Sequence, residues 1–292
     1  MGMAGQEHPR TVTTEPASLQ GEEVAPSRQQ ALLRLPSFHA VAWPVVTLAV
    51  LVGLWEAVVL LFKTPVYILP SPVEVATVGW SMLPLLWEHT LWTAWEVAIA
   101  FVLSVAIGVP LGVLAVESKP FERTVYPLLV ASQTFPKLAI APLLTVWFGL
   151  GFTPKILVAF LIAFFPVVIN TAVGLRSVES EMIALSRSIG LGRVGTFFKI
   201  KLPAALPSMF GGFKIAITLA LVGAVVGEFL GSENGLGHIM IVAQGTIQMG
   251  LLFAALIALT VLGLVAYGLV ALAEMVAIPW RTDATTVAQG SM

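Results

Sequence analysis

The first candidates for chemistry are ionisable side chains that lie inside long apolar stretches of this 292-residue chain. A charged side chain at the centre of a bilayer costs roughly 2.5–3.5 kcal/mol on insertion scales, so each such group needs a polar partner or a task. Two of them, Lys214 and Glu274, lie near the ends of their stretches, and we expect them to reach the lipid headgroups. The full set is Glu56, Glu96, Lys137, Lys214, Glu228 and Glu274.

Three polar residues are candidates for lining a solute pathway: Gln133, Lys137 and Glu228. Lys137 is central in its apolar stretch, follows a proline and lies one helical turn from Gln133, so we expect it to face protein or water rather than lipid. There it would offer positive charge to an anionic solute; the alternative is an ion pair with Glu56 or Glu96. Glu228 lies near one end of its stretch, where it either lines the mouth of the pathway or simply reaches water.

Residues for enzymatic chemistry are scarce. The chain has one aspartate, Asp283, four histidines, no H-E-x-x-H sequence and no clustered acid–base pair, and we expect a structural role for His89 and His238. The absence of cysteine excludes disulfides, thiolate metal sites and cysteine nucleophiles. No G-x-x-x-x-G-K-[ST] sequence and no Gly-Lys dipeptide occurs, so the chain has no usual P-loop for a nucleotide phosphate. We therefore expect no catalytic residue, no metal site and no cofactor bound by this chain.

The composition is that of a membrane protein. Hydrophobic residues make up 58% and charged residues only 11%, against about 25% charged in soluble domains. A net charge of −1 gives no argument for binding nucleic acid. Six apolar stretches each reach the ~20 residues that a helix needs to cross a bilayer, where the backbone must satisfy its own hydrogen bonds. The sequence thus predicts an all-α membrane protein with six transmembrane helices at 40–62, 89–116, 124–150, 156–175, 208–230 and 249–278.

The segments outside these spans indicate orientation. Eleven Lys and Arg residues lie on the side of the two termini and two, Lys63 and Lys155, on the other, which places both termini in the cytoplasm. We expect disordered tails at 1–38 and 282–292 around a transmembrane domain at 39–281. Residues 71–88 begin with a capping-box spacing and carry two tryptophans, as expected of a short helix at the outer membrane surface.

Two G-x-x-x-G pairs predict close contacts between helices. They are Gly108/Gly112 and Gly223/Gly227. We expect them to pack helices within the chain, with a seam between two copies of the chain as the alternative.

The loop at 176–207 contains seven charged residues, against two in the 47 residues at 124–170. Ser177 is expected to cap a helix whose first turn carries Glu179 and Glu181. Gly190 and Gly192 then predict a turn. A second helix should follow from Val194 to Lys201, ended by Pro203 and Pro207. The pattern alone is equally compatible with an ordinary solvated connection.

This loop resembles a family. Gly190, nine residues, Ile200, one residue and Leu202-Pro203 follow the EAA loop of the permease subunits of bacterial ABC importers, whose pattern is EAA, three residues, Gly, nine residues, Ile, one residue and Leu-Pro. Four further segments resemble the branch that imports sulfonates, taurine, nitrate and related solutes. They are ILPSP (68–72), GVPLG (108–112), SQTFPKLAIAPLLTVWFGLG (132–151) and GAVVGEFLGSENGLG (223–237).

The resemblance implies that the loop's first helix docks on a separate ATPase and transmits its motion. At the three EAA positions this chain has Ala184-Leu185-Ser186, so the glutamate that often braces the helix is absent. Glu181, three residues earlier on the same helix face, is a partial substitute. The implied coupling residues are Glu181, Ala184, Leu185, Ser186, Arg187, Gly190, Ile200, Leu202 and Pro203.

The resemblance also implies an assembly in the bacterial cytoplasmic (inner) membrane. It would contain a type I permease with six spans, a second permease copy, expected as a homodimer, two cytoplasmic ABC ATPases that bind ATP and magnesium, and an external solute-binding protein. The implied solute is a small anion such as a sulfonate, taurine or nitrate, and the alternative is a pyrimidine or flavin precursor. An intramembrane enzyme and a channel remain as functions of other classes, although no filter-like motif supports a channel.

Overall fold

The computed structural model describes residues 38–280 and divides the chain into two units, with the boundary between Val52 and Gly53 inside helix α1 (Phe38–Phe62). Helix α1 is apolar, and its residues Ala42–Phe62 form a candidate membrane span. The predicted tails at 1–38 and 282–292 lie outside the described residues, except that Phe38 is the first residue of α1.

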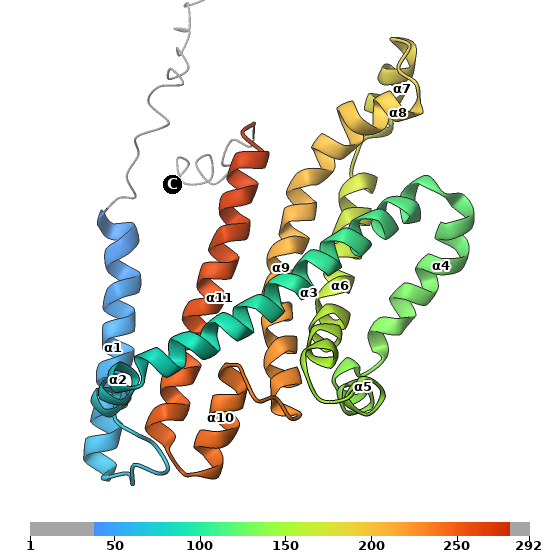
Figure 1. The fold of residues 1–292 in the computed structure, drawn as a ribbon. Helices are drawn as coiled ribbons and strands as arrows, with labels where there is room; N and C mark the ends of the chain where they lie inside the picture. The colour runs from blue at the N-terminus through green and yellow to red at the C-terminus, as the bar shows by residue number, and fades with distance from the viewer. Residues whose placement is uncertain (1–37, 281–292) are drawn as a thin grey trace, which may run out of the picture. The chain divides into compact units, whose positions relative to one another are not determined.

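The second unit is built from helices (Figure 1). The long helices are α3 (Leu83–Glu117), α6 (Phe152–Arg176), α9 (Leu202–Phe229) and α11 (Met249–Ala277). The shorter ones are α2 (Pro72–Ser81), α4 (Lys119–Ala131), α5 (Ala141–Phe148), α7 (Ser180–Ser188), α8 (Arg193–Thr196) and α10 (Leu236–Gly245). Five helices of the described chain are long and apolar enough to cross a membrane, or six if α4 and α5 are halves of one span.

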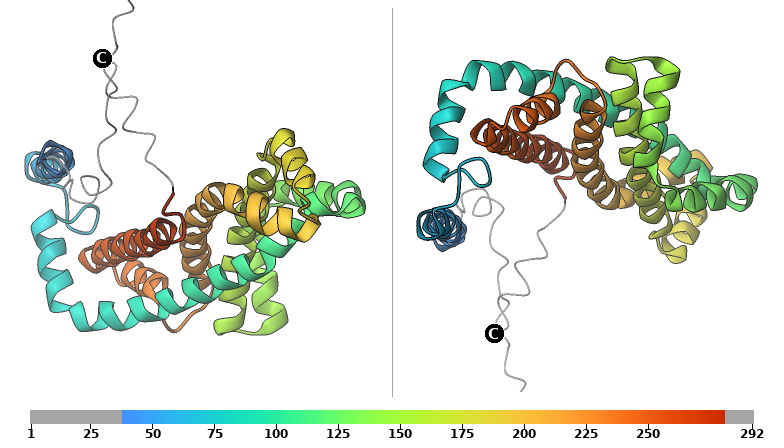
Figure 2. Two further views of the ribbon diagram at one scale, coloured as in Figure 1. Left: turned by 90° about the horizontal axis from the view of Figure 1, so that it is seen from above. Right: turned by 90° about the horizontal axis from the view of Figure 1, so that it is seen from below.

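Helix α6 is the centre of the second unit, since it packs against both α3 and α9, and α9 in turn lies between α6 and α11 (Figure 2). Both G-x-x-x-G pairs face α6. A methyl group at Gly108 would approach Val167 Cγ1 to 2.8 Å, and one at Gly223 would approach Ala159 Cα to 2.5 Å. The prediction of packing within the chain is therefore confirmed, and the alternative of a seam between copies is wrong for these pairs.

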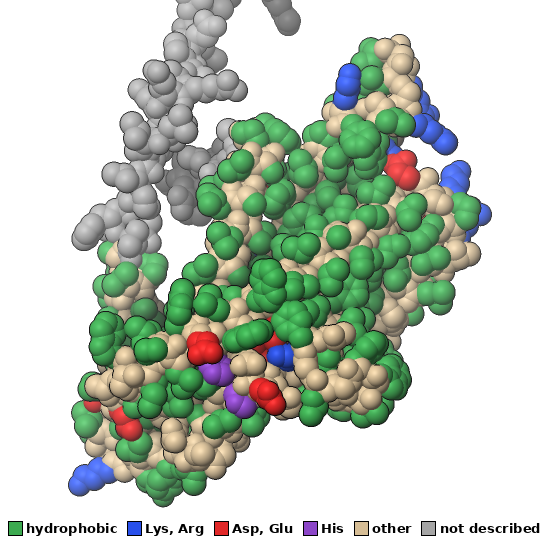
Figure 3. Space-filling model, in the orientation of Figure 1, with side chains coloured by type: hydrophobic (Ala, Val, Ile, Leu, Met, Phe, Trp, Pro, Cys, Tyr) green, Lys and Arg blue, Asp and Glu red, His purple; other side chains and the backbone are tan. Residues whose placement is uncertain are grey.

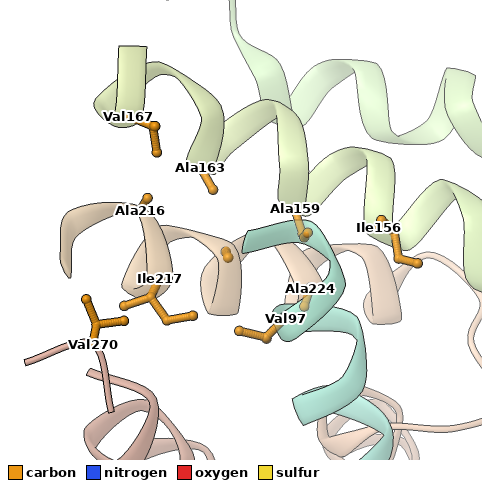
Figure 4. Packing of buried hydrophobic residues seen from close by; sticks show 11 residues of the cluster. Val97, Ile156, Ala159, Ala163, Val167, Ala216, Ile217, Ala224 and Val270 are labelled. Carbon is orange, nitrogen blue, oxygen red and sulfur yellow. The ribbon is translucent and has the colours of Figure 1, made fainter. Parts of the chain in front are cut away.

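Small side chains fill the contact between α6 and α9 (Figure 4). Ala159 and Ala163 of α6 meet Ala216, Ala220 and Ala224 of α9, all with no exposed surface. In lipid, helices associate through close van der Waals packing rather than by expelling water, so small residues at this seam let the backbones approach.

The second predicted span, 89–116, begins six residues later than the helix in the structure, α3, which starts at Leu83. Helix α2 starts as predicted, with the Ser71 hydroxyl accepting a hydrogen bond from the Glu74 N–H at 3.1 Å, but it ends at Ser81. Residues 83–88 belong to α3, whose 35 residues span about 52 Å at 1.5 Å per residue. Because this exceeds the ~30 Å of hydrocarbon, a membrane-embedded α3 must tilt, and it crosses α6 and α9 obliquely (Figure 1).

The third predicted span, 124–150, is not one continuous helix. It is broken into α4, two short 3₁₀ turns at Ser132–Thr134 and Lys137–Ile140, and α5, with a bend of 84° between the two halves. The break coincides with Pro136, and Pro142 follows in the first turn of α5. Proline removes a backbone donor and clashes with the preceding turn, so hydropathy alone could not reveal that the helix bends here.

Candidate functional site

The helices at 180–196 form the first candidate site, and they differ from prediction at their start. Helix α7 is preceded by Glu179 as its N-cap residue, while Ser177 closes the end of α6 by donating a hydrogen bond from its hydroxyl to the Gly174 carbonyl at 2.8 Å. The predicted cap at Ser177 is therefore wrong, because α6 extends to Arg176 and the serine is its C-cap residue. Glu181 lies in the first turn of α7, as predicted.

Gly190 ends α7 in a Schellman arrangement. Its φ of +84° is in the left-handed region that favours glycine. The Leu191 N–H donates to the Ser186 carbonyl at 2.9 Å, and the Gly190 N–H donates to the Arg187 carbonyl at 3.0 Å. These are the two bonds of the motif, so the predicted glycine turn is confirmed and reverses the chain into α8.

Ser186 faces inward from α7 and is fully buried, with 0% exposure. Its hydroxyl lies 2.7 Å from the Ile183 carbonyl and 3.0 Å from the hydroxyl of Thr196 in α8, which is 5% exposed. This contact joins the two short helices across the turn. The sequence analysis did not find it, because the residues are ten apart and meet only once the angle between the helices is known.

Apolar side chains on the outward face of α7 are exposed at helical spacing. Met182, Leu185 and Ile189 have 46%, 57% and 68% of their surface exposed, and we call these three the α7 ridge. Residues three, four or seven apart share one face of a helix. Ala184 and Arg187 are exposed elsewhere on the same helix, and the Glu181 carboxylate accepts a hydrogen bond from the neighbouring Ser180 hydroxyl at 3.1 Å.

The second helix of the segment does not end at Pro203 and Pro207, contrary to prediction. Residues from Arg193 to Phe229 run as one long helix that contains a π-helical turn at Phe197–Lys201. In this turn the Leu202 N–H bonds to the Phe197 carbonyl, five residues back. The wider turn changes the backbone register just before Pro203, and a proline is tolerated in the first turn of the α9 segment that follows.

Two ion pairs tie this end of α9 and α6 to the α3–α4 corner. The Lys201 ammonium lies 2.6 Å from the Glu117 carboxylate, and the Arg176 guanidinium lies 2.8 Å from the Glu122 carboxylate. Of the other predicted coupling residues, Ile200 is in the π turn, while Leu202 and Pro203 begin α9; all three are half-buried. The nine predicted coupling residues thus lie on one continuous stretch of the structure from α7 to α9.

The pathway candidates are placed differently from one another. Lys137 is half-buried at the break between α4 and α5, and its ammonium lies 4.0 Å from the centre of the Phe165 ring in mid-α6. Among the described residues it forms no ion pair, so the alternative of a pair with Glu56 or Glu96 is absent from this part of the chain. Gln133 is exposed in the preceding 3₁₀ turn.

Glu228 is buried, with 1% exposure, in a polar network rather than at an open surface. Its carboxylate accepts hydrogen bonds from the Thr93 hydroxyl at 2.6 Å and from the Gly237 N–H, in the first turn of α10, at 2.5 Å. The same Thr93 oxygen accepts from the Leu236 N–H at 2.9 Å. In this geometry Glu228 stabilises the start of α10.

Lys155 is the member of this network that the sequence analysis missed. The predicted span 156–175 leaves Lys155 in the preceding loop. In the structure α6 starts at Phe152, so Lys155 lies inside the helix and is buried. It pairs with Glu96 of α3 and donates to the Ser232 hydroxyl at 2.9 Å. The local sequence could have placed Lys155 in the helix, because a proline such as Pro154, shortly after Gly151, is typical of the first turn of a helix.

Two histidines, His89 and His238, lie next to this network. The His89 ring accepts a hydrogen bond from the Gly235 N–H at 3.0 Å and stacks on His238 with 6.0 Å between the ring centres. Figure 3 shows histidines beside acidic side chains on this face. The structural role expected for His89 fits these contacts, because its acceptor nitrogen fixes the glycine before α10. Lys214 and Glu274, which are expected to reach the lipid headgroups, pair with each other.

Comparison with known proteins agrees with this architecture. The chain is 40% identical over 256 residues to the riboflavin transport system permease protein of Chloroflexus aurantiacus, covering 86% of this chain and 96% of the relative. It is 32% identical over 237 residues to a putative aliphatic sulfonates transport permease protein of Bacillus subtilis, covering 80% and 86%. An inward-facing structure of the MetNI methionine ABC transporter matches with a TM-score of 0.58 at 21% identity, over 68% of this chain and 98% of that chain.

The family whose description reads "binding-protein-dependent transport system inner membrane component" matches residues 104–274, which include α6, the α7 ridge and the ion pairs of Arg176, Lys201 and Lys214. The all-α fold with five or six candidate spans is the type I ABC permease fold of the structural neighbour. On this evidence the chain belongs to the family of inner-membrane permease components of binding-protein-dependent transport systems.

Proposed function

We propose that this ABC permease is the membrane subunit of an importer driven by a separate ATPase, and that the ATPase docks on the α7 ridge. The observation that carries the proposal is the exposure of Met182, Leu185 and Ile189 on a helix that is too short and too charged to enter lipid. An exposed apolar face rimmed by charged residues is typical of a protein-binding surface. The basic residues Arg187 of α7 and Arg193 of α8 are exposed in the same segment.

The charge distribution supports a cytoplasmic position for this surface and for both termini. The end of the bundle with α7 carries seven described Lys and Arg residues, none of which is buried: Lys119, Arg123, Arg176, Arg187, Arg193, Lys199 and Lys201. At the opposite end of the second unit Lys63 is exposed, whereas Lys155 is buried inside α6. Basic residues concentrate on the cytoplasmic side of membrane proteins.

The proposed complex contains two copies of this permease, two ABC ATPases carrying ATP and magnesium, and an external solute-binding protein, in the cytoplasmic membrane of a bacterium. The apolar outer faces of the helices support contact with lipid and with the second copy. Two apolar grooves, of about 620 and 660 Å³, lie along α3 and α11 on such a face. Catalysis of ATP hydrolysis is assigned to the partner chains.

The test of docking is affinity purification of the full chain in mild detergent, with identification of co-purifying proteins and an ATPase assay. We expect a stoichiometric P-loop ATPase with the unaltered chain and its loss with Leu185→Glu, which puts a charge on the ridge. Ser180→Glu is the matched control, because it adds the same charge about 140° around the same helix. A chain that purifies without an ATPase, or equal binding by both variants, contradicts ridge docking.

For the solute we propose a small anion such as a sulfonate, taurine or nitrate. The support is Lys137, a half-buried cation on an aromatic ring at the break of a candidate span, together with the similarity to a sulfonate permease. The second candidate is a flavin or pyrimidine precursor, which the higher identity to a riboflavin permease favours.

Uptake by the reconstituted complex separates the two solutes. With its own binding protein, radiolabelled taurine, nitrate and riboflavin are compared at equal concentration. For an anion we expect Lys137→Gln to lower uptake about tenfold or more, since a charge-assisted hydrogen bond contributes about 1.5–3 kcal/mol. Selective uptake of riboflavin, unaffected by Lys137→Gln, would replace the anion with the flavin.

A further inference from the structure

Two features connect α7 to α8 in the described chain. One is the backbone turn through Gly190 and Gly192, which connects α7 to α8. The other is the hydroxyl contact between Ser186 and Thr196, at 3.0 Å. A turn centred on glycines can change its dihedral angles at little cost, so the buried side-chain contact is a second constraint on the angle between the helices, beside the backbone bonds of the turn.

The direction of the hydrogen bond follows from the inventory of donors. The Ser186 hydroxyl has one hydrogen, and at 2.7 Å it donates this hydrogen to the Ile183 carbonyl. The hydrogen shared between the two hydroxyls must then come from Thr196, with Ser186 as acceptor. Both side chains are almost fully buried, so losing either hydroxyl leaves the arrangement incomplete where water cannot easily replace it.

Thr196 is connected to the membrane helices through a continuous helix. It is the last residue of α8, its backbone N–H bonds to the Gly192 carbonyl at 2.9 Å, and the same helix continues through the π turn into α9. Four residues after the start of that turn, Lys201 pairs with Glu117 at the end of α3. Thr196 is therefore linked both to α9, through the helix, and to α3, through this ion pair.

We propose that the Ser186–Thr196 pair is a positioning element, which holds the α7 ridge at a fixed angle to α9 so that movement of the docked ATPase is transmitted to the membrane helices. The serine at the third EAA position, where the family pattern has alanine, supplies the acceptor of this bond. The inference rests on the proposed docking of an ATPase on the ridge.

The first test measures coupling in the reconstituted full complex, as solute molecules transported per ATP hydrolysed. Ser186→Ala and Thr196→Val each remove one hydroxyl, and we expect each to lower this ratio about two- to tenfold, the range set by one hydrogen bond. The double variant should be no worse than either single one, because both remove the same bond. Thr196→Ser, which keeps the hydroxyl, should retain coupling.

Ser188→Ala is the matched control. Its hydroxyl donates to the Leu185 carbonyl at 2.8 Å within the same helix and is exposed, so the variant should couple like the unaltered chain. An unaltered ratio in Ser186→Ala and Thr196→Val, with normal ATPase binding, overturns the positioning role and leaves docking intact. Absence of ATPase binding by the unaltered chain overturns both proposals.

A second measurement does not depend on assembly of the variants. The chain has no cysteine, so spin labels can be attached at cysteines introduced in place of Arg187 and Lys199, which are both exposed. We expect one narrow distance distribution in the chain that retains Ser186 and Thr196, and in Thr196→Ser, and a clearly broader one in Ser186→Ala and Thr196→Val. A distribution that stays narrow in both hydroxyl-deleted variants also overturns the proposal.

Discussion

At the scale of single residues, four of the charged side chains inside the apolar helices are arranged as two ion pairs. Lys155 and Glu96 pair between α6 and α3, and Lys214 and Glu274 pair between α9 and α11. Composition and hydropathy locate such residues but not their partners, because pairing depends on which helix faces meet. The sequence analysis accordingly found Glu96 but offered a pair of Lys137 with Glu56 or Glu96 only as an alternative to solute contact, and the Lys137 ammonium lies on Phe165.

Removing one member of the Lys155–Glu96 pair should destabilise the protein strongly. Lys155→Met leaves the Glu96 carboxylate buried without its cation, and we expect a loss of about 3–5 kcal/mol in unfolding free energy. The double variant Lys155→Met/Glu96→Met should recover most of this loss. Unfolding of the detergent-solubilised chain by SDS measures both, with the exposed Lys199→Met as control. A single variant as stable as the control contradicts the structural role of the pair.

At the scale of elements, small residues decide which helices touch. Gly223 faces the Ala159 backbone of α6, whereas Gly211, earlier in α9, has no atom within 4 Å of the position its methyl group would occupy. Alanine is the better helix former by about 1 kcal/mol. The two positions therefore offer the same substitution with opposite expected effects.

Gly223→Ala should destabilise the chain, and Gly211→Ala should leave it unchanged or slightly more stable. Forcing a methyl group into the α6–α9 seam separates the backbones, an overpacking cost of about 1–3 kcal/mol. The unfolding assay in SDS compares the two variants directly. Equal stability of the two would mean that α6 and α9 do not pack through Gly223.

Gly190→Ala tests the turn after α7. No atom lies within 4 Å of the added methyl group, so the expected cost of about 1–2 kcal/mol comes only from the left-handed backbone. The loss should be local. Hydrogen exchange should speed up in α7 and α8 and stay unchanged in α6; equal exchange in α7 would show that the turn tolerates a side chain.

The elements were predictable to the extent that hydropathy and turn residues determine them. The apolar runs located α1, α6, α9 and α11, and the glycine spacing located the turn after α7. The kink at 132–136, the π turn before Pro203 and the 10-residue α10 were not predicted. Each depends on backbone hydrogen bonds that a proline or a buried carboxylate redirects, and such bonds leave no periodic pattern in the sequence.

At the scale of the whole molecule, the proposal depends on which side of the membrane carries α7. The charge asymmetry predicts that α7 lies on the cytoplasmic side. Docking of an ATPase on the α7 ridge requires this position, because an ATPase that uses cytoplasmic ATP reaches no other surface. The chain itself offers a direct test, since it has no cysteine to interfere with labelling. Ser188 in α7 and Lys63 after α1 are both exposed and lie on opposite predicted sides.

Ser188→Cys should react with a membrane-impermeant maleimide only in inverted vesicles or after permeabilisation. Lys63→Cys should react in cells whose cytoplasmic membrane is intact and whose outer layers admit the reagent. The two variants control for each other, since each sample contains one thiol and the reagent is the same. The reverse pattern would place the ridge outside the cell. It would then be a surface for the solute-binding protein, and the coupling assigned to Ser186 and Thr196 would lose its ATPase.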